Sequence, residues 1–323
     1  MATVPTLAGP LESSELGTVL MHEHIFNITA EIQIAHPGFN GWDPEVEIPK
    51  AQRQLREVKA AGIDTLVELS PIGLGRSLEL IRRATEGSGL NVVLATGLYT
   101  YDVLPRPWHF AGPGTMLNGD EPLDALMRGD LTDGIEGSGV TPGFLKCAID
   151  AAGLTDHVER VVRSVCRLHQ ETGTPICIHT SAPHERGREA LSILAEEDID
   201  PSRVMLAHCG DSTDLGYLEE MAASGALLGM DRFGLDIILG AEERIETVVS
   251  MCELGHAGSM VLSQDAMCFT DWFPPGLREQ VAPNWHFLHV PRDVVPELLR
   301  RGVTPEQVDQ MLRHNPREFF ERT

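Results

Sequence analysis

The sequence is short of basic residues. Its 323 residues include 25 lysines and arginines against 48 aspartates and glutamates, which gives a formal net charge of −23. A surface with this excess of negative charge repels the phosphate backbone of nucleic acids and the anionic headgroups of lipids. We therefore expect neither nucleic acid nor a membrane among the partners of this protein.

Long apolar runs and disulfide patterns are also missing. No run approaches the roughly 20 apolar residues of a membrane span, and the N-terminal MATVPTLAGPLESSELG has neither the basic nor the apolar part of a secretion signal. The six cysteines form no CxxC pair and lack the dense spacing of a small disulfide scaffold. We expect a cytoplasmic protein whose cysteines are reduced and serve packing.

What is present is typical of a globular chain with a large core. Hydrophobic residues make up 42% of the sequence and charged residues 23%, so nothing in the composition indicates disorder. The length exceeds that of most single domains, but an α/β barrel of about 250 residues with insertions is commonly one domain. We predict one domain over residues 1–323.

Short apolar runs alternate with helical patterns from about residue 50, as in the βα units of a parallel sheet. Eight runs predict an α/β fold, a (β/α)8 barrel with its active site at the carboxyl ends of the strands. The predicted strands are 17–25, 64–70, 91–97, 143–149, 174–180, 203–209, 226–231 and 259–265. The predicted helices are 49–62, 77–87, 156–173, 184–197, 243–255 and 304 to about 320. Long connections at 98–121 and 266–291 follow strands and would rise from the active-site face.

Four histidines lie at the ends of predicted strands. His22 and His24 are one residue apart, so the two-residue repeat of a strand points both side chains to one side. His179 and His208 end two further strands. The separations of 33 residues from Lys146 to His179, 29 to His208 and 57 to Asp265 correspond to one, one and two βα units. This spacing predicts a metal site at the barrel mouth.

Lys146 stands in the apolar run GFLKCAI, where a free ammonium would be costly. One interpretation is a lysine that pairs with an acid or extends its stem outward. The other is chemical: a buried amine takes up CO2, and the carbamate is an anionic ligand able to bridge two metals. Asp265 ends the strand SMVLSQD, where it could bind metal and accept a proton from water, or cap the following segment.

Several segments carry a resemblance across nearly the whole chain: MHEH (21–24), GLGR (73–76), TGLYTY (96–101), GFLKCAID (143–150), IHT (178–180), AHCGDSTD (207–214), GMDRFGLD (229–236) and DWFPP (271–275). As a set they resemble the phosphotriesterase family of the amidohydrolase superfamily, and most closely its phosphotriesterase-like lactonases. The resemblance implies a distorted TIM barrel, usually a homodimer, with two divalent transition metal ions. Zinc is the first expectation, with iron, cobalt or manganese as alternatives.

The resemblance also implies a role for each ligand. His22 and His24 would bind the more buried metal and His179 and His208 the more exposed one. Carboxylated Lys146, formed with CO2, would bridge both, and Asp265 would complete the buried site.

Substrate contacts follow from the same resemblance. Tyr99 would sit over the metals near the substrate carbonyl, and Arg232 and Trp272 would line the lactone pocket. The alternative for Tyr99 is packing at the barrel mouth, and the alternative for Arg232 is an ion pair with the adjacent Asp231. Gln264 replaces the histidine of related lactonases and should point away from the metals.

Together with these residues, the resemblance implies a binuclear metal-dependent hydrolase that opens lactones, including N-acyl-homoserine lactones and related γ- and δ-lactones, with promiscuous phosphotriesterase activity. Two cations that share a water would make it a hydroxide nucleophile, and Asp265 would carry the proton to the leaving alkoxide. One alternative is primarily an organophosphate triesterase, because the same hydroxide attacks phosphorus. A remote alternative is a non-catalytic barrel that only binds a ligand.

Overall fold

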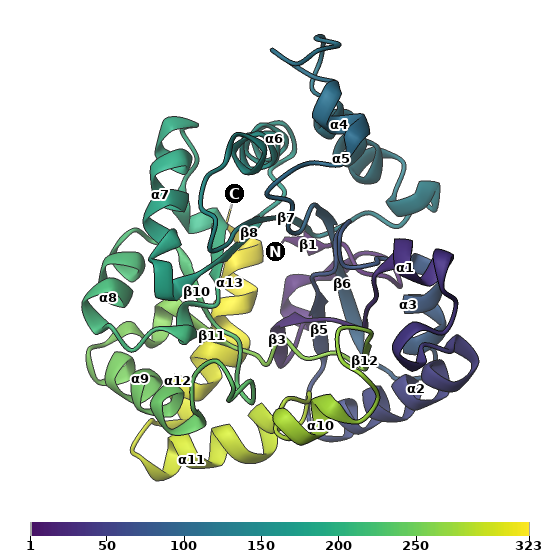
Figure 1. Cartoon of the computed structure of the whole chain (residues 1–323). Helices are drawn as coiled ribbons and strands as arrows, with labels where there is room; N and C mark the ends of the chain where they lie inside the picture. Colours follow the sequence, from purple (N-terminus) through teal and green to yellow (C-terminus); the bar gives the residue numbers. More distant parts are fainter. Residues whose placement is uncertain (1, 323) are drawn as a thin grey trace.

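The computed structural model describes residues 2–322, and eight parallel strands rolled into a barrel form its centre (Figure 1). Every predicted strand is present, in the expected order, and the fold is a (β/α)8 TIM barrel. The barrel strands are β3 (Val19–Glu23), β5 (Thr65–Glu68), β6 (Asn91–Gly97), β7 (Phe144–Ile149), β8 (Ile176–Thr180), β9 (Val204–Ala207), β10 (Leu227–Met230) and β11 (Met260–Leu262).

β3 and β11 are the two ends of this sheet, and the chain that follows β11 closes the barrel against β3. Backbone hydrogen bonds run from Asp265 to His22, from His24 to Ala266 and from Cys268 to Ile25. Further along, β12 (Phe269–Thr270) pairs in parallel with β4 (Phe26–Asn27). A separate short pair, β1 (Thr3–Val4) and β2 (Leu11–Glu12), lies near the N-terminus. We refer to the contact between residues 22–25 and 263–268 as the barrel seam.

Helices surround the barrel (Figure 1). The predicted ones are confirmed as α2 (Pro44–Ala60), α3 (Leu78–Thr85), α6 (Asp156–Thr172), α7 (Arg186–Glu196) and α9 (Ala241–Glu253). The last predicted helix comprises α12 (Pro305–Asp309), a π-helical turn and α13 (Asn315–Glu321). Helices that the sequence patterns did not predict are α5 (Pro122–Thr132), α8 (Leu215–Ala223) and α11 (Val295–Arg300). Short helices α4 (Arg106–Phe110) and α10 (Leu277–Val281) interrupt the two long connections, and α1 (Ala30–Ala35) follows β4.

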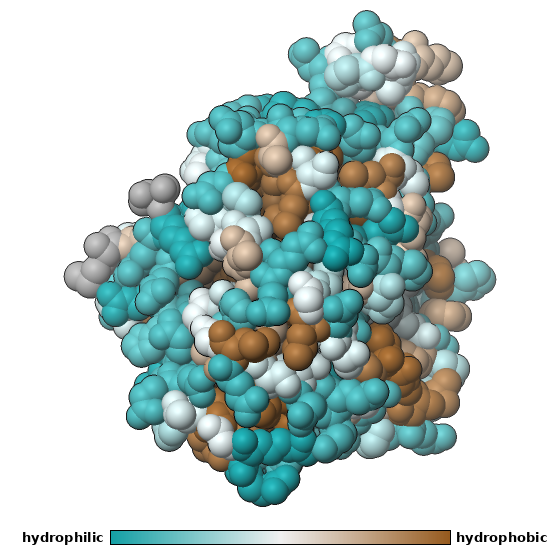
Figure 2. All heavy atoms as spheres, turned by 90° about the vertical axis from the view of Figure 1, so that its left-hand side faces the viewer, coloured by the Kyte–Doolittle hydropathy of each residue, from teal (hydrophilic) through white to brown (hydrophobic). Residues whose placement is uncertain are grey.

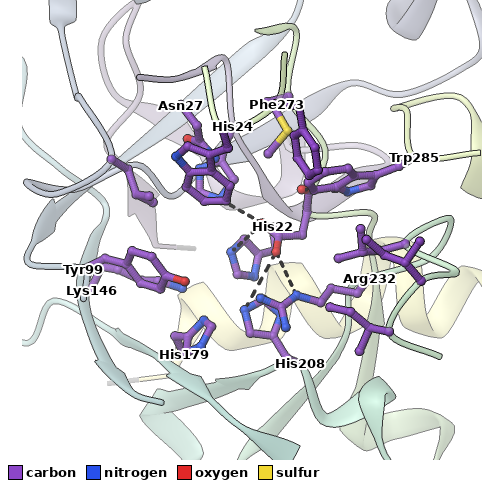
Figure 3. Close-up of a pocket in the computed structure, with 17 residues that line it drawn as sticks. His22, His24, Asn27, Tyr99, Lys146, His179, His208, Arg232, Phe273 and Trp285 are labelled. Atoms are coloured by element: carbon purple, nitrogen blue, oxygen red, sulfur yellow. Dashed lines mark hydrogen bonds and ion pairs between the residues drawn. The ribbon is translucent and has the colours of Figure 1, made fainter. Parts of the chain in front are cut away.

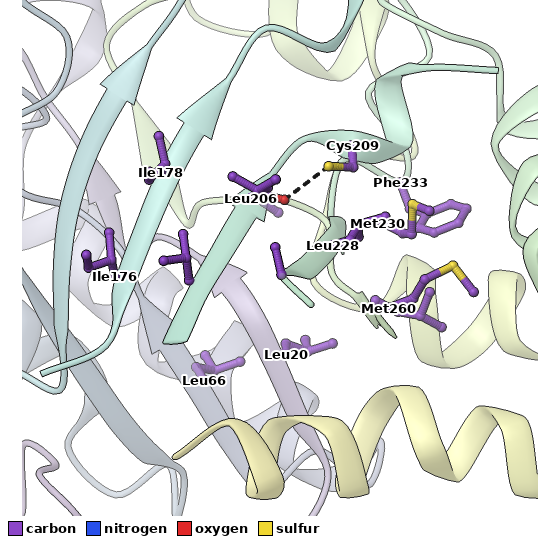
Figure 4. Close-up of a cluster of buried hydrophobic side chains, with 14 of the residues drawn as sticks. Leu20, Leu66, Ile176, Ile178, Leu206, Cys209, Leu228, Met230, Phe233 and Met260 are labelled. Carbon is purple, nitrogen blue, oxygen red and sulfur yellow. Dashed lines mark hydrogen bonds between the residues drawn. The ribbon is translucent and has the colours of Figure 1, made fainter. Parts of the chain in front are cut away.

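Alternation along the strands divides the core into two layers. Leu20 faces the helices in a cluster that includes Leu66, Ile176 and Leu206 (Figure 4). Its neighbours Val19 and Met21 face the barrel interior, in a second cluster that Phe319 and Phe320 of α13 help to form. All six cysteines are free and buried, as expected for packing residues.

The outer surface is mostly polar. Hydrophilic residues dominate the face shown in Figure 2, and apolar residues gather in separate patches. Among residues 2–322, no helix combines the length and apolar character needed to cross a membrane.

Candidate metal centre

The six predicted ligand side chains line one cavity of about 210 Å³ at the carboxyl ends of the barrel strands (Figure 3). Five of them are at most 3% exposed, and Asp265 is 8% exposed. The strands therefore bring together residues that are distant in sequence, as the spacing predicted. The six are His22 on β3, His24 after β3, Lys146 on β7, His179 on β8, His208 after β9 and Asp265 after β11.

Three of the histidines are oriented through their Nδ1 atoms. Asp231, which directly follows β10, lies 2.7 Å from His22 Nδ1 through Oδ2 and 2.9 Å from His208 Nδ1 through Oδ1. Asp231 Oδ1 also accepts the backbone N–H of His208 at 2.8 Å. His24 Nδ1 lies 2.8 Å from Ser70 Oγ. An imidazole whose Nδ1–H is donated in this way keeps the Nε2 lone pair free as a ligand.

The Nε2 atoms of these histidines converge on the Asp265 carboxylate. Asp265 Oδ1 lies 2.9 Å from His24 Nε2 and 3.6 Å from His22 Nε2, and its Oδ2 lies 3.9 Å from His208 Nε2. Donor atoms of His22, His24 and Asp265 all fall within 4.8 Å of one another. A buried set of imidazole nitrogens and one carboxylate oxygen fits a divalent transition metal.

His179 has the opposite orientation. Its Nε2 lies 3.6 Å from Oδ1 of Asp150, the residue that follows β7. The Nδ1 atom is therefore the ring nitrogen that does not face this carboxylate. The His179 ring packs edge-on against Tyr99 and His208, with centroid distances of 4.9 and 4.5 Å. The contact with His179 lowers the pKa of Asp150 to about 2.

Lys146 lies in the wall of the same cavity. It is 1% exposed, and its Nζ lies 3.2 Å from the Sγ of Cys177 on the neighbouring strand. Gly97 on β6 allows the backbone of β7 to lie close at this point, because a Cβ at its φ of +139° would lie 1.8 Å from the Lys146 carbonyl oxygen. Among the described residues, no carboxylate forms an ion pair with Lys146, and the hydrogen-bond partner of its Nζ is the Cys177 thiol.

Three of the four histidines, His22, His179 and His208, have pKa values lowered toward the neutral form that binds metals. Burial, aided by the nearby Lys146, lowers the pKa of His22 to about 4. Burial likewise lowers the pKa values of His179 and His208. Neutral imidazoles present a lone pair at neutral pH, so protons do not compete with a metal there.

Asp265 ends a chain of buried charges. Arg232 Nε lies 3.0 Å from Asp265 Oδ2, Arg232 Nη1 lies 2.9 Å from Asp211 Oδ2, and Arg244 Nη1 lies 2.6 Å from Asp211 Oδ1. Burial alone would raise the pKa of Asp265, but His22, His24, His208 and Arg232 outweigh it and hold that pKa well below its usual range. The alternative prediction, an ion pair between Arg232 and the adjacent Asp231, is wrong, because Arg232 pairs with Asp265 and Asp211. Asp231 contacts the two histidines instead.

Two of the site residues adopt left-handed backbone conformations. His208 has a φ of 67° and Asp265 a φ of 53°. Such a conformation costs a non-glycine residue on the order of 1 kcal/mol or more and persists only where the surroundings enforce it. Both side chains line the cavity, and Figure 3 shows His208 among the labelled residues of its wall.

The rest of the cavity wall is largely apolar. Tyr99 and Arg232 line it near the ligands, and burial raises the pKa of the Tyr99 hydroxyl. Trp272 stands at the rim and is 47% exposed. Gln264 is turned away, as predicted, and donates its amide to the Phe287 carbonyl at 2.7 Å. The apolar part of the wall consists of Leu74, Leu235, Ile237, Ile238, Met267, Trp272, Phe273 and Trp285.

Asp231 is the main residue that sequence reasoning missed. It ends the apolar run ALLGM just as Asp265 ends SMVLSQ, so the strand-end rule used for the histidines applied to it as well. Ser70 and Asp150 also lie just beyond the ends of barrel strands. Their signal was the same position at the carboxyl end of a predicted strand.

Fold and site together define a TIM-barrel protein with a histidine-rich, carboxylate-containing pocket that includes candidate groups for metal binding. The sequence model of the Phosphotriesterase family matches residues 2–320, and the chain belongs to that family. Members of the family are generally metal-dependent hydrolases with a binuclear centre.

Individual relatives agree with this assignment. The chain is 48% identical to the Phosphotriesterase homology protein of Mycobacterium tuberculosis over 322 residues, which covers 100% of this chain and 98% of that protein. It is 30% identical to the Aryldialkylphosphatase of Saccharolobus solfataricus, with 96% of each chain covered. The solved structure of the phosphotriesterase from Mycobacterium tuberculosis superimposes with a TM-score of 0.96 at 48% identity, over 99% of this chain and 98% of that one.

Proposed function

We propose that the protein is a binuclear metal-dependent lactonase, with N-acyl-homoserine lactones and related γ- and δ-lactones as substrates and phosphotriester hydrolysis as a promiscuous activity. The observation that supports this proposal is the composition of the cavity. Its floor carries histidines and a carboxylate, while most of its wall is aliphatic and aromatic. A polar head with a strained ester and an apolar tail matches these two surfaces.

The ligand assignment is part of the proposal. His22, His24 and Asp265 would hold the more buried cation, and His179 and His208 the more exposed one. We propose zinc, with iron, cobalt or manganese as alternatives. When bound, the two cations would lower the pKa of a shared water and polarise the substrate carbonyl. Asp231 and Ser70 would keep the histidine rings in their binding tautomers through the Nδ1 contacts.

Lys146 would contribute as a carboxylated lysine. The unmodified side chain places an amine among metal ligands, with the Cys177 thiol as its hydrogen-bond partner in the structure. Addition of CO2 to Nζ, with loss of one proton, converts the amine into a carbamate whose two oxygens can each take one cation. Charge balance in the buried site supports this modification.

The remaining roles, proton transfer and substrate binding, would belong to side chains of the protein. Asp265, at the centre of the Nε2 atoms, would take the proton from the attacking water and pass it to the leaving alkoxide. Tyr99, packed on His179, would donate its hydroxyl to the substrate carbonyl oxygen. Arg232 would hold Asp265 in place and line the pocket beside the lactone ring. Trp272, Ile237 and Ile238 would contact the acyl chain at the exposed rim.

The second candidate is an enzyme that acts primarily on organophosphate triesters. The name of the Saccharolobus solfataricus relative, Aryldialkylphosphatase, favours it. Measuring kcat/KM for acyl-homoserine lactones of several chain lengths and for a paraoxon-like triester separates the two. We expect the lactones to be preferred and longer acyl chains to lower KM; a clear preference for the triester would replace our first proposal.

Metal content tests whether the barrel is an enzyme at all. We expect about two transition metal ions per chain, and loss of bound metal and of lactone hydrolysis in Lys146→Ala. Mass spectrometry of the intact native protein reports the carbamate directly as added CO2. A folded wild-type chain that binds no metal and hydrolyses no ester would favour the non-catalytic, ligand-binding alternative.

We also propose that residues 1–323 act as one catalytic domain, in the cytoplasm, as a homodimer. Exposed large apolar side chains support a second copy as partner, because an interface between two copies would remove them from water. Ile34 is 82% exposed, Val103 66%, Met116 75% and Leu117 64%. Sedimentation analysis of wild type and of Met116→Asp tests this point, and the variant should be monomeric.

A further inference from the structure

Glu23 stands between the two histidines of the HxH pair but has different partners. The register of β3 against β5 shifts between Leu20 and Glu23, and beyond this irregularity His22 and His24 line the cavity whereas Glu23 does not. Glu23 is 0% exposed. A fully buried carboxyl group needs several donors, and Glu23 finds all of them at the barrel seam, in the segment that carries Asp265.

Three groups of that segment donate to the Glu23 carboxylate. Ser263 Oγ and the backbone N–H of Gln264 donate to Oε1, each at 2.9 Å. The backbone N–H of Ala266 donates to Oε2, also at 2.9 Å. Between these two amides, the N–H of Asp265 donates to the carbonyl oxygen of His22 at 3.1 Å. Three consecutive amides, 264 to 266, are therefore fixed by two consecutive residues of β3.

This arrangement explains how Asp265 keeps a left-handed conformation without glycine. The φ of 53° at Asp265 is unfavourable for a residue with a Cβ. The amides of both neighbouring residues donate to the same carboxylate, and the Asp265 N–H donates to the His22 carbonyl, so the backbone is restrained on both sides of Asp265. The left-handed turn in turn sets the direction in which the Asp265 carboxylate leaves the chain, toward His24 Nε2 at 2.9 Å.

A second buried glutamate at a strand end, Glu68, does not make the same contacts as Glu23. Glu68, at the end of β5, accepts backbone N–H groups of Ile25 and Ser70, each at 3.3 Å. Those contacts are longer, and neither involves an Asp265 neighbour. Glu23 alone, among the residues that the structure describes, accepts from both amides that flank Asp265.

We propose that Glu23 is a positioning residue that sets the Asp265 carboxylate against His22 and His24 and thereby determines the affinity of the more buried metal position. This inference rests on the proposed function, since it assumes that a metal binds there. Glu23 itself does not touch the metal or the substrate in this proposal. It acts through the backbone of residues 264 to 266.

The test is a cobalt(II) titration of the full-length, metal-depleted protein. A chromophoric chelator competes for the ion and reports affinity, while visible absorption of bound cobalt reports ligand geometry. Wild type should bind two ions. Glu23→Gln places an NH2 group against a backbone N–H, and Glu23→Asp is too short to reach both amides. Both should bind the buried ion roughly 10- to 100-fold more weakly, as is usual when a residue that orients a ligand is lost, with an altered cobalt spectrum.

Asn315 provides a matched control at the other end of β11. It is 2% exposed, and its side-chain amide donates to the carbonyl oxygens of Ala257 and Met260 at 2.7 and 2.6 Å. Asn315→Ala should lower the melting temperature but leave cobalt affinity and spectrum unchanged.

The outcomes separate the two proposals. Wild-type affinity and spectrum in Glu23→Asp, or in a folded Glu23→Gln, overturn the role of Glu23 and leave the metal centre intact. An equal loss of cobalt affinity in Asn315→Ala also overturns it, because general destabilisation then accounts for the effect. If Glu23→Gln does not fold, Glu23→Asp decides. Failure of the wild type to bind cobalt refutes the metal centre itself, and the role of Glu23 with it.

Discussion

Replacing Asp231 by asparagine removes a carboxylate on which two histidines depend. Asp231 is 0% exposed and accepts from His22 Nδ1 at 2.7 Å, from His208 Nδ1 at 2.9 Å and from the His208 N–H at 2.8 Å. Asparagine offers one oxygen and one NH2 group in nearly the same volume. At least one Nδ1–H therefore faces another donor, and that imidazole must turn or move its proton to Nε2.

The magnitude follows from the bond that is lost. A hydrogen bond to a charged group contributes about 1.5 to 3 kcal/mol, which corresponds to roughly a 10- to 150-fold change in an equilibrium constant. A proton on Nε2 takes the lone pair away from the cavity, so the loss should fall on metal affinity more than on folding. We expect Asp231→Asn to bind zinc roughly 10- to 100-fold more weakly at pH 7, and to lose activity in proportion at limiting metal.

Zinc competition against a chromophoric chelator measures this directly. The control is Asp130→Asn, another buried carboxylate, which accepts from Thr96 Oγ1 at 2.5 Å and pairs with Arg76 at 2.8 Å, outside the metal-site cavity. That variant should lose stability and keep its zinc affinity. A zinc affinity within twofold of wild type in Asp231→Asn would refute the reasoning, because the carboxylate would then not be orienting the rings.

Three further predictions concern pH and the pocket wall. The pKa of His22 is lowered from 6.5 to about 4 in the folded protein. As the pH falls below 6.5, the unfolded chain therefore binds this proton before the folded chain does. The free energy of unfolding of the chelator-treated protein should be unaffected by this group above pH 6.5 and should decline from there toward pH 4. The free energy of unfolding lost through this histidine is up to ~3 kcal/mol. Urea unfolding at several pH values should show this loss in wild type and a smaller loss in His22→Asn, and the same dependence of unfolding free energy on pH in both proteins would contradict the prediction. Tyr99→Phe keeps the edge-on packing on His179, so we expect an unchanged melting temperature with kcat reduced about 10-fold or more; an unchanged kcat would limit Tyr99 to packing. Trp272→Ala, at a half-exposed position, should raise KM for long-chain lactones but not for short ones, and an equal effect on both would place the acyl chain elsewhere.

The strands were predictable because their chemistry is local. Each barrel strand is an apolar run of a few residues, and the spacing between the strand-end histidines matches whole βα units. The same reasoning located the cavity floor, since carboxyl ends of parallel strands meet at one face of a barrel. The helix α8 was missed although Asp214 caps it at the Tyr217 N–H, because its apolar positions give only a weak helical period.

The orienting contacts were not predictable from spacing. That Arg232 pairs with Asp265 and Asp211, and not with its neighbour Asp231, depends on the direction of β10 where it leaves the barrel. The role of Glu23 requires knowing that residues 263 to 266 pack on β3, a contact between positions about 240 residues apart in the chain. The local sequence pattern cannot predict these ion pairs and hydrogen bonds, because the residues come together only when the sheet closes into a barrel.

The barrel seam has a consequence for the growth of the chain. His22 and His24 leave the ribosome long before Asp265, because the seam joins segments that are far apart in sequence, as in the contact of His22 with Ser263 across 241 residues. Two neighbouring histidines alone make a weak chelate, so in the proposed metal centre a chain that has not yet brought Asp265 to His22 and His24 would lack a high-affinity position for the buried ion. Capture of that ion would therefore require that the two ends of the barrel sheet have met.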